Sequence, residues 1–361
     1  MPVYVCMIML VPVIIGLVGL IISKGRITFK EFFLQQAVLL VVVVVGFFMA
    51  RWQSTQDVEV WSGRVVNKEK DKVSCGHSYP CNPHPCNCGK DGCDTCWDTC
   101  YRHSHDFDWN AYTSNREDWR ITIDRIDDQG VHEPPRWTQT HIGDPTAQAH
   151  GFVNYIKANP GSILRRTGAA DKFKAYLPPY PNKVYDYYHC DRFLVVGVEV
   201  PDIKQWNTML SEINADLGAK KWVNIVFVAV GLDESEYTYA LEEVWIGGKK
   251  NDLVIVAGVP NYPQIKWVSV FSWSIAEDLK VELRDAILGI GTLERRDDIG
   301  LQIHQLTDQK FIYRSMDDFK YLMAGAQPGT AGTLILFTIG TMLSVGMTVF
   351  FWKEDPFGDR Y

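Results

Sequence analysis

The sequence predicts a membrane-anchored protein of mixed α+β and α/β class, with three transmembrane helices, a Cys-rich mainly β subdomain and an α/β subdomain. Three uncharged runs, seven cysteines within 26 residues and an alternation of apolar strands with amphipathic helices support this prediction. The chain has 361 residues, of which 47% are hydrophobic and 22% charged, so it is neither disordered nor collagen-like.

The uncharged runs 3–22, 32–50 and 331–352 hold 20, 19 and 22 residues. Each is long enough to cross a hydrocarbon core of about 30 Å, so the lipid bilayer is the first predicted partner. The predicted domains are a transmembrane helical hairpin over 1–50, a Cys-rich mainly β subdomain over 51–189, an α/β subdomain over 190–330, a third span over 331–352 and a tail over 353–361.

The orientation in the membrane is predicted from the first loop. No basic residue precedes the first apolar run, which favours a retained helix over a cleaved signal peptide. Lys24, Arg26 and Lys30 in the short loop favour a cytoplasmic position for it, because short cytoplasmic loops carry excess positive charge. We therefore expect a multi-pass protein whose body lies on the periplasmic side of the inner membrane. Basic residues after the second span favour the opposite orientation, which stays open: Arg51, Arg64, Lys68 and Lys70.

The body between the spans, residues 51–330, is acidic. Its 280 residues carry 31 basic and 39 acidic side chains, a net charge of −8. An acidic body without a basic stripe cannot neutralise a run of phosphates, so we expect no nucleic-acid partner.

In the first part of the body, apolar and polar residues alternate over 58–66 and 119–126, the period of half-buried strands. The charged run 67–72 is expected to end the first strand. Residues 147–159 are compatible with one helix that Pro160 stops.

The second part is more regular. Asp202 is expected to cap a helix that runs to Leu217, with Gly218 as its C-cap, and the remaining strands and helices are predicted over 223–231, 235–245, 253–258, 266–273 and 276–288. Strands 223–231 and 253–258 are expected to pair in one sheet, buried at Val226 and Val254, under the helices near 203–217 and 277–288.

Residues about 200–320 resemble the TPM domain, through VNIVFVAVG and IGGKKNDLVIVAG placed between helices. The resemblance implies a small α/β module that is anchored by a transmembrane helix and faces away from the cytoplasm. The chain has FSWSIAED over 271–278 where the family has a Gly-Tyr-Gly-Leu-Glu-like stretch, so no metal or phosphatase role is carried over. The whole chain, above all residues 93–109, also resembles membrane proteins of tailed bacteriophages.

The cysteines are the strongest local signal. Outside the cytoplasm we expect a disulfide staple, because this Pro- and Asn-rich segment is too short to build a core. At least two bridges are predicted within 75–100, and Cys190 either joins them or stays buried and free. Zinc is the alternative, as is a redox pair of Cys93 with Cys96. The candidate residues are Cys75, Cys81, Cys86, Cys88, Cys93, Cys96, Cys100 and Cys190, interleaved with His77 and His84.

Two further sets of residues are candidate metal ligands. His103, His105, Asp106 and Asp108 could hold a metal if alternate positions share a strand face, although a polar strand or loop end beside the cysteines is the simpler interpretation. Glu277 and Asp278 could bind a hard cation, or could be favourable charges in the first turn of a helix. We expect no cofactor, with zinc as the alternative.

Nothing in these patterns requires catalysis. We expect a membrane-tethered interaction or scaffold module, phage-encoded and acting at the host envelope, with an envelope or membrane protein or a further copy of the chain as its partner. The alternative is a metal-dependent hydrolase or a thiol oxidoreductase centred on the Cys/His segment. Small residues in the spans, Gly16, Gly19, Gly340 and Gly346, allow either a compact bundle or assembly with other copies.

Overall fold

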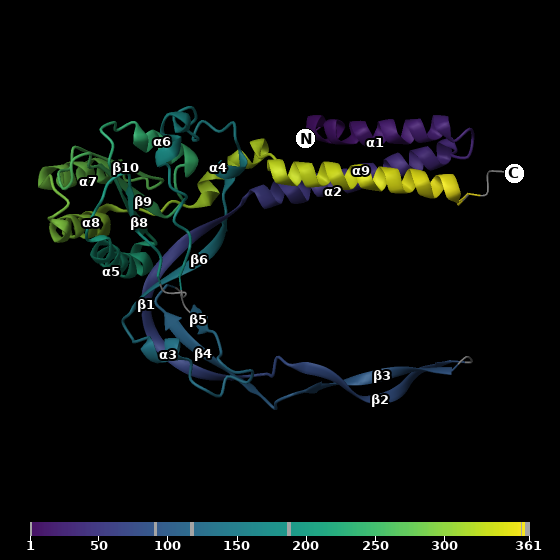
Figure 1. Ribbon diagram of the computed structural model, residues 1–361, viewed down its shortest axis with the longest axis horizontal. Coiled ribbons are helices and arrows are strands. Elements are labelled where there is room, and N and C mark those ends of the chain that lie inside the picture. Colours follow the sequence, from purple (N-terminus) through teal and green to yellow (C-terminus); the bar gives the residue numbers. More distant parts are fainter. Residues whose placement is uncertain (1, 90–91, 116–118, 186–188, 355, 358–361) are drawn as a thin grey trace. The chain divides into compact units, whose positions relative to one another are not determined.

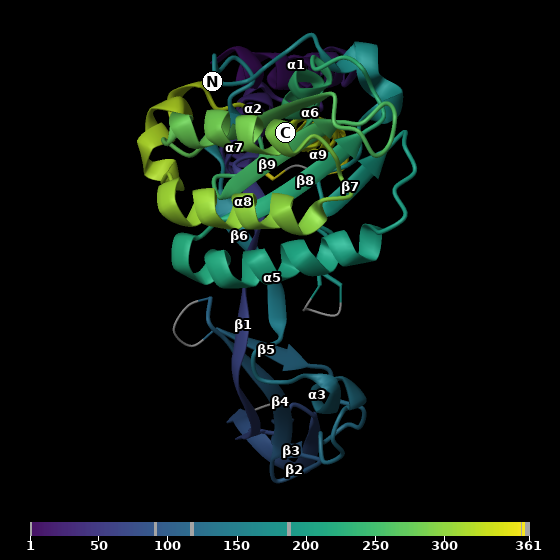
Figure 2. The ribbon, with the colours of Figure 1, turned by 90° about the vertical axis from the view of Figure 1, so that its left-hand side faces the viewer.

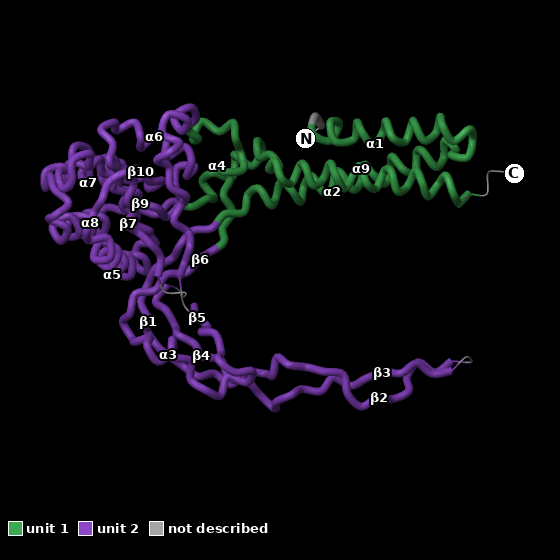
Figure 3. Tube along the Cα trace, viewed as in Figure 1, with its two compact units in different colours: residues 1–57, 151–166, 315–361 green, residues 58–150, 167–314 purple. Residues whose placement is uncertain are grey.

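The computed structural model describes residues 2–89, 92–115, 119–185, 189–354 and 356–357, and it divides into two compact units (Figure 3). Unit 1 holds residues 1–57, 151–166 and 315–361. Unit 2 holds residues 58–150 and 167–314.

Unit 1 is built on three helices, α1 (Pro2–Ile22), α2 (Phe29–Ser54) and α9 (Thr330–Lys353), which pack on one another (Figure 1). All three are long and apolar enough to cross a membrane, which supports a membrane protein. Two short helices, α4 (Tyr155–Ala158) and the 3₁₀ helix η2 (Met316–Gly325), pack on each other. Apolar side chains of all three long helices form a shared core: Val5, Ile8, Val43, Phe47 and Leu336.

Polar side chains also join the three long helices. Gln35 Nε2 donates to the Ser344 carbonyl at 2.9 Å and to its hydroxyl at 3.0 Å. The Ser344 hydroxyl donates to the Pro12 carbonyl at 3.1 Å. Such bonds satisfy polar groups that lipid cannot, and among the described residues the helices form the compact bundle, the first of the two predicted arrangements.

The first sheet has the strand order β5-β4-β1-β6. Its strands are β1 (Gln56–Val73), β4 (Asp106–Thr113), β5 (Arg120–Ile123) and β6 (Pro145–Val153), with the short helix α3 (Pro135–Gln139) between β5 and β6. The interior of this sheet contains Val65, Trp109, Ala111, Ile121 and Ile123.

The prediction that the charged run 67–72 ends the first strand is wrong, because β1 pairs with β4 as far as Val73. Two lysines of the run are held by aromatic rings. The Lys68 ammonium lies 3.8 Å from the Trp137 ring centroid and donates to two backbone carbonyls. The Lys70 ammonium lies 4.3 Å from the Phe107 ring centroid. These contacts make a charged stretch compatible with a strand.

The predicted helix 147–159 is also wrong. Most of it belongs to β6, which pairs with the open edge of β1, and only the single turn α4 is helical. The Asn154 side chain caps α4 by accepting from Lys157 N at 2.9 Å. Pairing with a distant strand overrides a weak helical preference that Gly151 lowers further.

Strands β2 (Ser78–Gly89) and β3 (Gly92–Tyr101) form an antiparallel hairpin, called here the β2–β3 hairpin. Ser78 pairs with Tyr101 at its base and Gly89 with Gly92 at its tip. Most side chains along both strands are exposed, so the hairpin has almost no core of its own.

The second sheet of unit 2 has the order β10-β9-β8-β7. Its strands are β7 (Phe193–Val196), β8 (Asn224–Val230), β9 (Asp252–Gly258) and β10 (Trp267–Ser272). β7, β8 and β9 are parallel, and β10 is antiparallel to β9. Val226 lies opposite Val254, and both are fully buried, which confirms the predicted pairing.

Helices cover both faces of this sheet (Figure 2). Helices α5 (Ile203–Lys221), α7 (Glu277–Ile290) and α8 (Arg296–Lys310) share a core with Ile225 and Phe227. Helix α6 (Tyr237–Val244) and the 3₁₀ helix η1 (Ala170–Tyr176) pack on the other face, against Val226 and Val228. Strand β7 and helix α8 are elements that the sequence analysis did not predict.

Gly218 is not the C-cap of its helix. α5 continues to Lys221 and ends at Trp222, which takes the left-handed conformation with φ 57°. Gly218 lies inside the helix, where an added Cβ would come within 2.5 Å of the Ser62 carbonyl oxygen. The absence of a side chain at Gly218 allows α5 to approach the backbone of β1 closely.

Candidate functional site

Six of the eight cysteines of the body form three disulfides: Cys81–Cys100, Cys86–Cys96 and Cys88–Cys93. The expectation of at least two bridges within 75–100 is confirmed. Cys75 and Cys190 are buried and free. Because Cys93 and Cys96 bond to different partners, the alternative redox pair is not formed, and their thiols are not available as zinc ligands.

The three bridges are nested along the β2–β3 hairpin. Each connects the two strands. The Cα atoms of Cys81–Cys100 and Cys86–Cys96 are 5.8 and 5.7 Å apart, inside the range of about 4.4–6.8 Å that disulfides usually span, and those of Cys88–Cys93 at the tip are 4.0 Å apart. A two-stranded hairpin without a core is marginal in water, so covalent links take the place of apolar packing.

Three aromatic side chains are exposed on this hairpin, two at its base and one near its middle. Tyr79, Trp97 and Tyr101 are 47%, 56% and 57% exposed. Trp97 and Tyr101 are four residues apart on β3, so they lie on the same face of the strand. Exposed Trp and Tyr on a rigid support are typical of protein-binding surfaces.

A second feature lies where the hairpin joins the first sheet. Cys75 and His77 lie in the connection from β1 to β2, His103 lies in the return from β3, and Asp106 begins β4. Both strand pairs are antiparallel, with Val73 opposite Asp106 and Ser78 opposite Tyr101, so the two connections run side by side.

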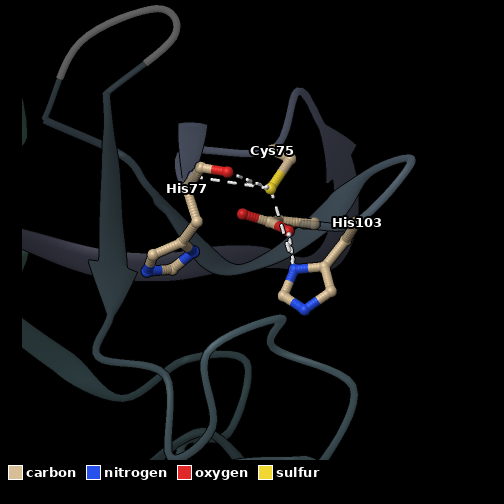
Figure 4. A group of neighbouring side chains, drawn as sticks. Cys75, His77 and His103 are labelled. Atoms are coloured by element: carbon tan, nitrogen blue, oxygen red, sulfur yellow. Dashed lines mark hydrogen bonds and ion pairs between the residues drawn. The ribbon is translucent and has the colours of Figure 1, made fainter. Parts of the chain in front are cut away.

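Four side chains converge, of which Figure 4 labels Cys75, His77 and His103. Cys75, His77, His103 and Asp106 each offer one ligand atom, and these atoms all lie within 4.8 Å of one another. His103 Nδ1 is 3.7 Å from Cys75 Sγ and 3.1 Å from Asp106 Oδ1. The backbone N–H of His77 donates to Cys75 Sγ at 3.4 Å. We call this group the Cys75 cluster.

Asp106 is the electrostatic centre of the cluster. Its carboxylate is fully buried, and Oδ2 accepts from the Gly76 backbone N–H and from Arg125 Nη1, both at 3.0 Å. The Gly76 N–H, followed by Arg125 and His103, holds the pKa of Asp106 well below its usual range, although desolvation acts in the opposite direction. The carboxylate is therefore ionised at neutral pH.

The structure brings together only part of the predicted metal set. His103 and Asp106 are in the cluster, but His105 Nδ1 lies 2.8 Å from the Ser104 hydroxyl, and Asp108 accepts from Arg125 Nη2 at 2.7 Å. The two histidines precede β4, which begins at Asp106, so strand alternation does not place them on one face. Of the four predicted residues, the structure places His103 and Asp106 together with Cys75 and His77.

His77 is the residue that sequence reasoning did not select. It stands among the cysteines, but its approach to His103 depends on the antiparallel pairing of β2 with β3. One signal in the sequence could have identified His77 as a ligand: the Cys-rich segment begins with C-G-H at 75–77 and ends with H-S-H-D at 103–106. If 78–101 is predicted as a hairpin, residues 75–77 and 103–106 are expected to lie side by side at its base.

The other candidate residues lie apart from this cluster. Glu277 and Asp278 occupy the first turn of α7, where they form ion pairs with Lys280 and Lys310, both at 2.8 Å. The Cys190 thiol donates to the Pro181 carbonyl at 3.3 Å, and burial raises its pKa.

A buried carboxyl group begins β9. Asp252 accepts from Asn224 Nδ2 at 2.7 Å, from the Lys249 backbone N–H at 2.6 Å and from the Tyr180 hydroxyl at 3.0 Å. Burial, which disfavours the charged form, raises its pKa to about 6 despite these hydrogen bonds. The glycine-rich turn 247–252 thus ends in a titratable group inside the second sheet.

Comparison of the chain with protein-family models, curated proteins and solved structures finds no match.

Proposed function

We propose that the chain is a multi-pass membrane protein that carries an extracytoplasmic interaction or scaffold module, with the β2–β3 hairpin as its partner-binding element. The observation that supports this proposal best is the set of three disulfides across an exposed hairpin. The proposed partner is an envelope or membrane protein.

The disulfides support a position outside the cytoplasm, because structural disulfides persist in oxidising compartments such as the periplasm. The loop between α1 and α2 supports the same orientation independently. It carries Lys24 and Arg26, and Lys30 follows in the first turn of α2, so the positive-inside bias favours a cytoplasmic loop. Exit of the chain through α2 and return through α9 would then leave residues 55–329 on the periplasmic side.

The hairpin is suited to binding rather than catalysis. Cross-links reduce the conformational entropy that a flexible loop would lose on association, so a stapled hairpin is preorganised for a partner. Trp97 and Tyr101 supply large, rigid side chains on one face. Their neighbours on the strands are mainly polar, as in the rim of a protein interface.

The setting is part of the same proposal. The resemblance of residues 93–109 to membrane proteins of tailed bacteriophages supports a phage-encoded protein that acts at the envelope of its host. The parallel pair β8 and β9, with the glycine-rich turn before β9, supports a TPM-like module in unit 2.

Thiol labelling in intact cells tests the orientation. A membrane-impermeant maleimide is expected to leave the six hairpin cysteines unlabelled before reduction and to label them after reduction. A Lys24→Cys variant is the control, labelled only after permeabilisation. Labelling of the hairpin without reductant, or none after reduction, contradicts the extracytoplasmic orientation.

Site-specific photo-crosslinking tests the interaction. A photoreactive amino acid at position 97 is expected to form an adduct with a protein of the envelope, and Tyr101→Ala is expected to weaken that adduct. The same amino acid at position 222, where Trp222 is exposed in the native chain, is the matched control. An adduct between two copies of the chain would indicate self-association, and equal adducts at both positions would contradict a binding role for the hairpin.

A further inference from the structure

We propose that the Cys75 cluster is a structural metal site that binds one Zn²⁺ ion through Cys75, His77, His103 and Asp106. The site would tie the base of the β2–β3 hairpin to the first sheet. This inference is independent of the partner that the hairpin binds.

The donor set fits zinc. One thiolate, two imidazoles and one carboxylate are ligands that zinc accepts, and four protein ligands are typical of structural rather than catalytic sites. Bonds of 2.0–2.3 Å in a tetrahedron place ligand atoms ~3.5 Å apart. The distances from His103 Nδ1 to Cys75 Sγ and Asp106 Oδ1, 3.7 and 3.1 Å, lie on either side of that value.

His77 supplies a second observation that points to a ligand. Its Nδ1 is buried and has no hydrogen-bond partner among the residues that the structure describes. Buried polar atoms in native proteins are nearly always paired, since an unpaired one retains the cost of desolvation. A metal ion bound through this nitrogen would remove that cost.

The surroundings orient the donors. Gly76 N–H and Arg125 Nη1 hold one oxygen of Asp106, which leaves the other oxygen toward His103. Arg125 is itself held by Asp108 at 2.7 Å. Such outer contacts are typical of metal ligands, because they fix the direction of the donating lone pair.

The same geometry argues against a Cys-His-Asp catalytic triad. A triad needs the thiol at one ring nitrogen of the histidine and the carboxylate at the other. Here Cys75 Sγ and Asp106 Oδ1 both approach His103 Nδ1. In a triad the three groups would form a chain of hydrogen bonds. Here the donor atoms converge on one point, as they do around a metal ion.

The full-length protein with its disulfides intact is the material for the test. Elemental analysis is expected to find about one zinc per chain. Titration of the metal-free protein with Co²⁺ as probe is expected to give a thiolate-to-cobalt charge-transfer band and the intense visible bands of a tetrahedral site. His103→Asn is expected to weaken Co²⁺ binding more than tenfold, whereas His105→Asn, two residues away and outside the cluster, is expected to leave it unchanged.

Cys75→Ser separates ligation from folding. It is expected to remove the charge-transfer band, while Cys190→Ser, which changes the other buried free thiol, keeps the band. A count of free thiols after denaturation checks that each variant retains its three disulfides. Absence of Co²⁺ and Zn²⁺ binding by the oxidised wild-type protein, or equal binding by the His103 and His105 variants, would overturn the proposal.

Discussion

The disulfide at the base of the β2–β3 hairpin is expected to stabilise strand pairing more than the disulfide at its tip. Cys81 and Cys100 are 19 residues apart in the sequence, and the bridges Cys86–Cys96 and Cys88–Cys93 lie inside that interval. With the inner bridges intact, the outer one closes a ring of roughly ten residues, which corresponds to about 3 kcal/mol of loop-closure entropy. The innermost bridge closes a ring of roughly six residues, which corresponds to about 2 kcal/mol.

Hydrogen exchange on the full-length protein measures these contributions locally. In the double variant Cys81→Ala/Cys100→Ala, amides near the base of the hairpin, at 78, 79, 81 and 98–101, are expected to exchange about 100-fold faster, since each 1.4 kcal/mol is about a factor of ten. In the matched variant Cys88→Ala/Cys93→Ala, the acceleration is expected to be about 30-fold and limited to the tip.

In this account, cross-links rather than a core hold the two strands together. If exchange at the base changes less than threefold in the first variant, side-chain and backbone contacts must hold the strands instead. If the tip variant accelerates exchange at the base more than the base variant does, the order of the two ring sizes does not determine local stability. Either outcome refutes the argument.

Two further predictions concern unit 2. The folded-state pKa of Asp252 lies near 6, above the value of 3.8 for a free Asp. Its contribution to stability is therefore present below about pH 4 and is lost as pH rises through about 6, a full decrease of about 3 kcal/mol. Unfolding followed by tryptophan fluorescence should show this decrease in the wild-type protein but not in Asp252→Asn, and a wild-type-to-variant difference independent of pH would contradict it. Gly218→Ala is expected to destabilise the chain by about 1–3 kcal/mol because its Cβ meets the Ser62 carbonyl, whereas Gly289→Ala, at an open position in α7, is expected to stabilise it by up to about 1 kcal/mol. The same unfolding assay checks this pair, and equal effects at the two glycines would argue against the close contact.

Local patterns in the sequence predict much of the fold. The three apolar helices follow from uncharged runs of sufficient length, because burial in lipid depends on composition alone. β8 and β9 follow from short, nearly continuous apolar runs, which are typical of strands that are buried on both faces. α5 follows from the helical spacing of its apolar residues. The cysteine density predicts disulfides because a segment of this composition cannot bury enough apolar surface to hold itself together.

Contacts between residues far apart in the sequence determine the elements that local patterns did not predict. The charged end of β1 is a strand because aromatic rings and backbone carbonyls from other elements receive Lys68 and Lys70. Residues 145–153 form β6 because the edge of β1 was available for pairing, a fact that no local window contains.

The candidate site likewise depends partly on residue type and partly on distant contacts. The sequence by itself determined that Cys75, His103 and Asp106 are chemically able to bind a metal. Only the tertiary structure decided that His77 joins them, that His105 and Asp108 do not, and which cysteines are bonded. The physical reason is that ligand identity is a property of single residues, whereas ligand geometry depends on the register of two antiparallel strand pairs that bring residues 75–77 and 103–106 together.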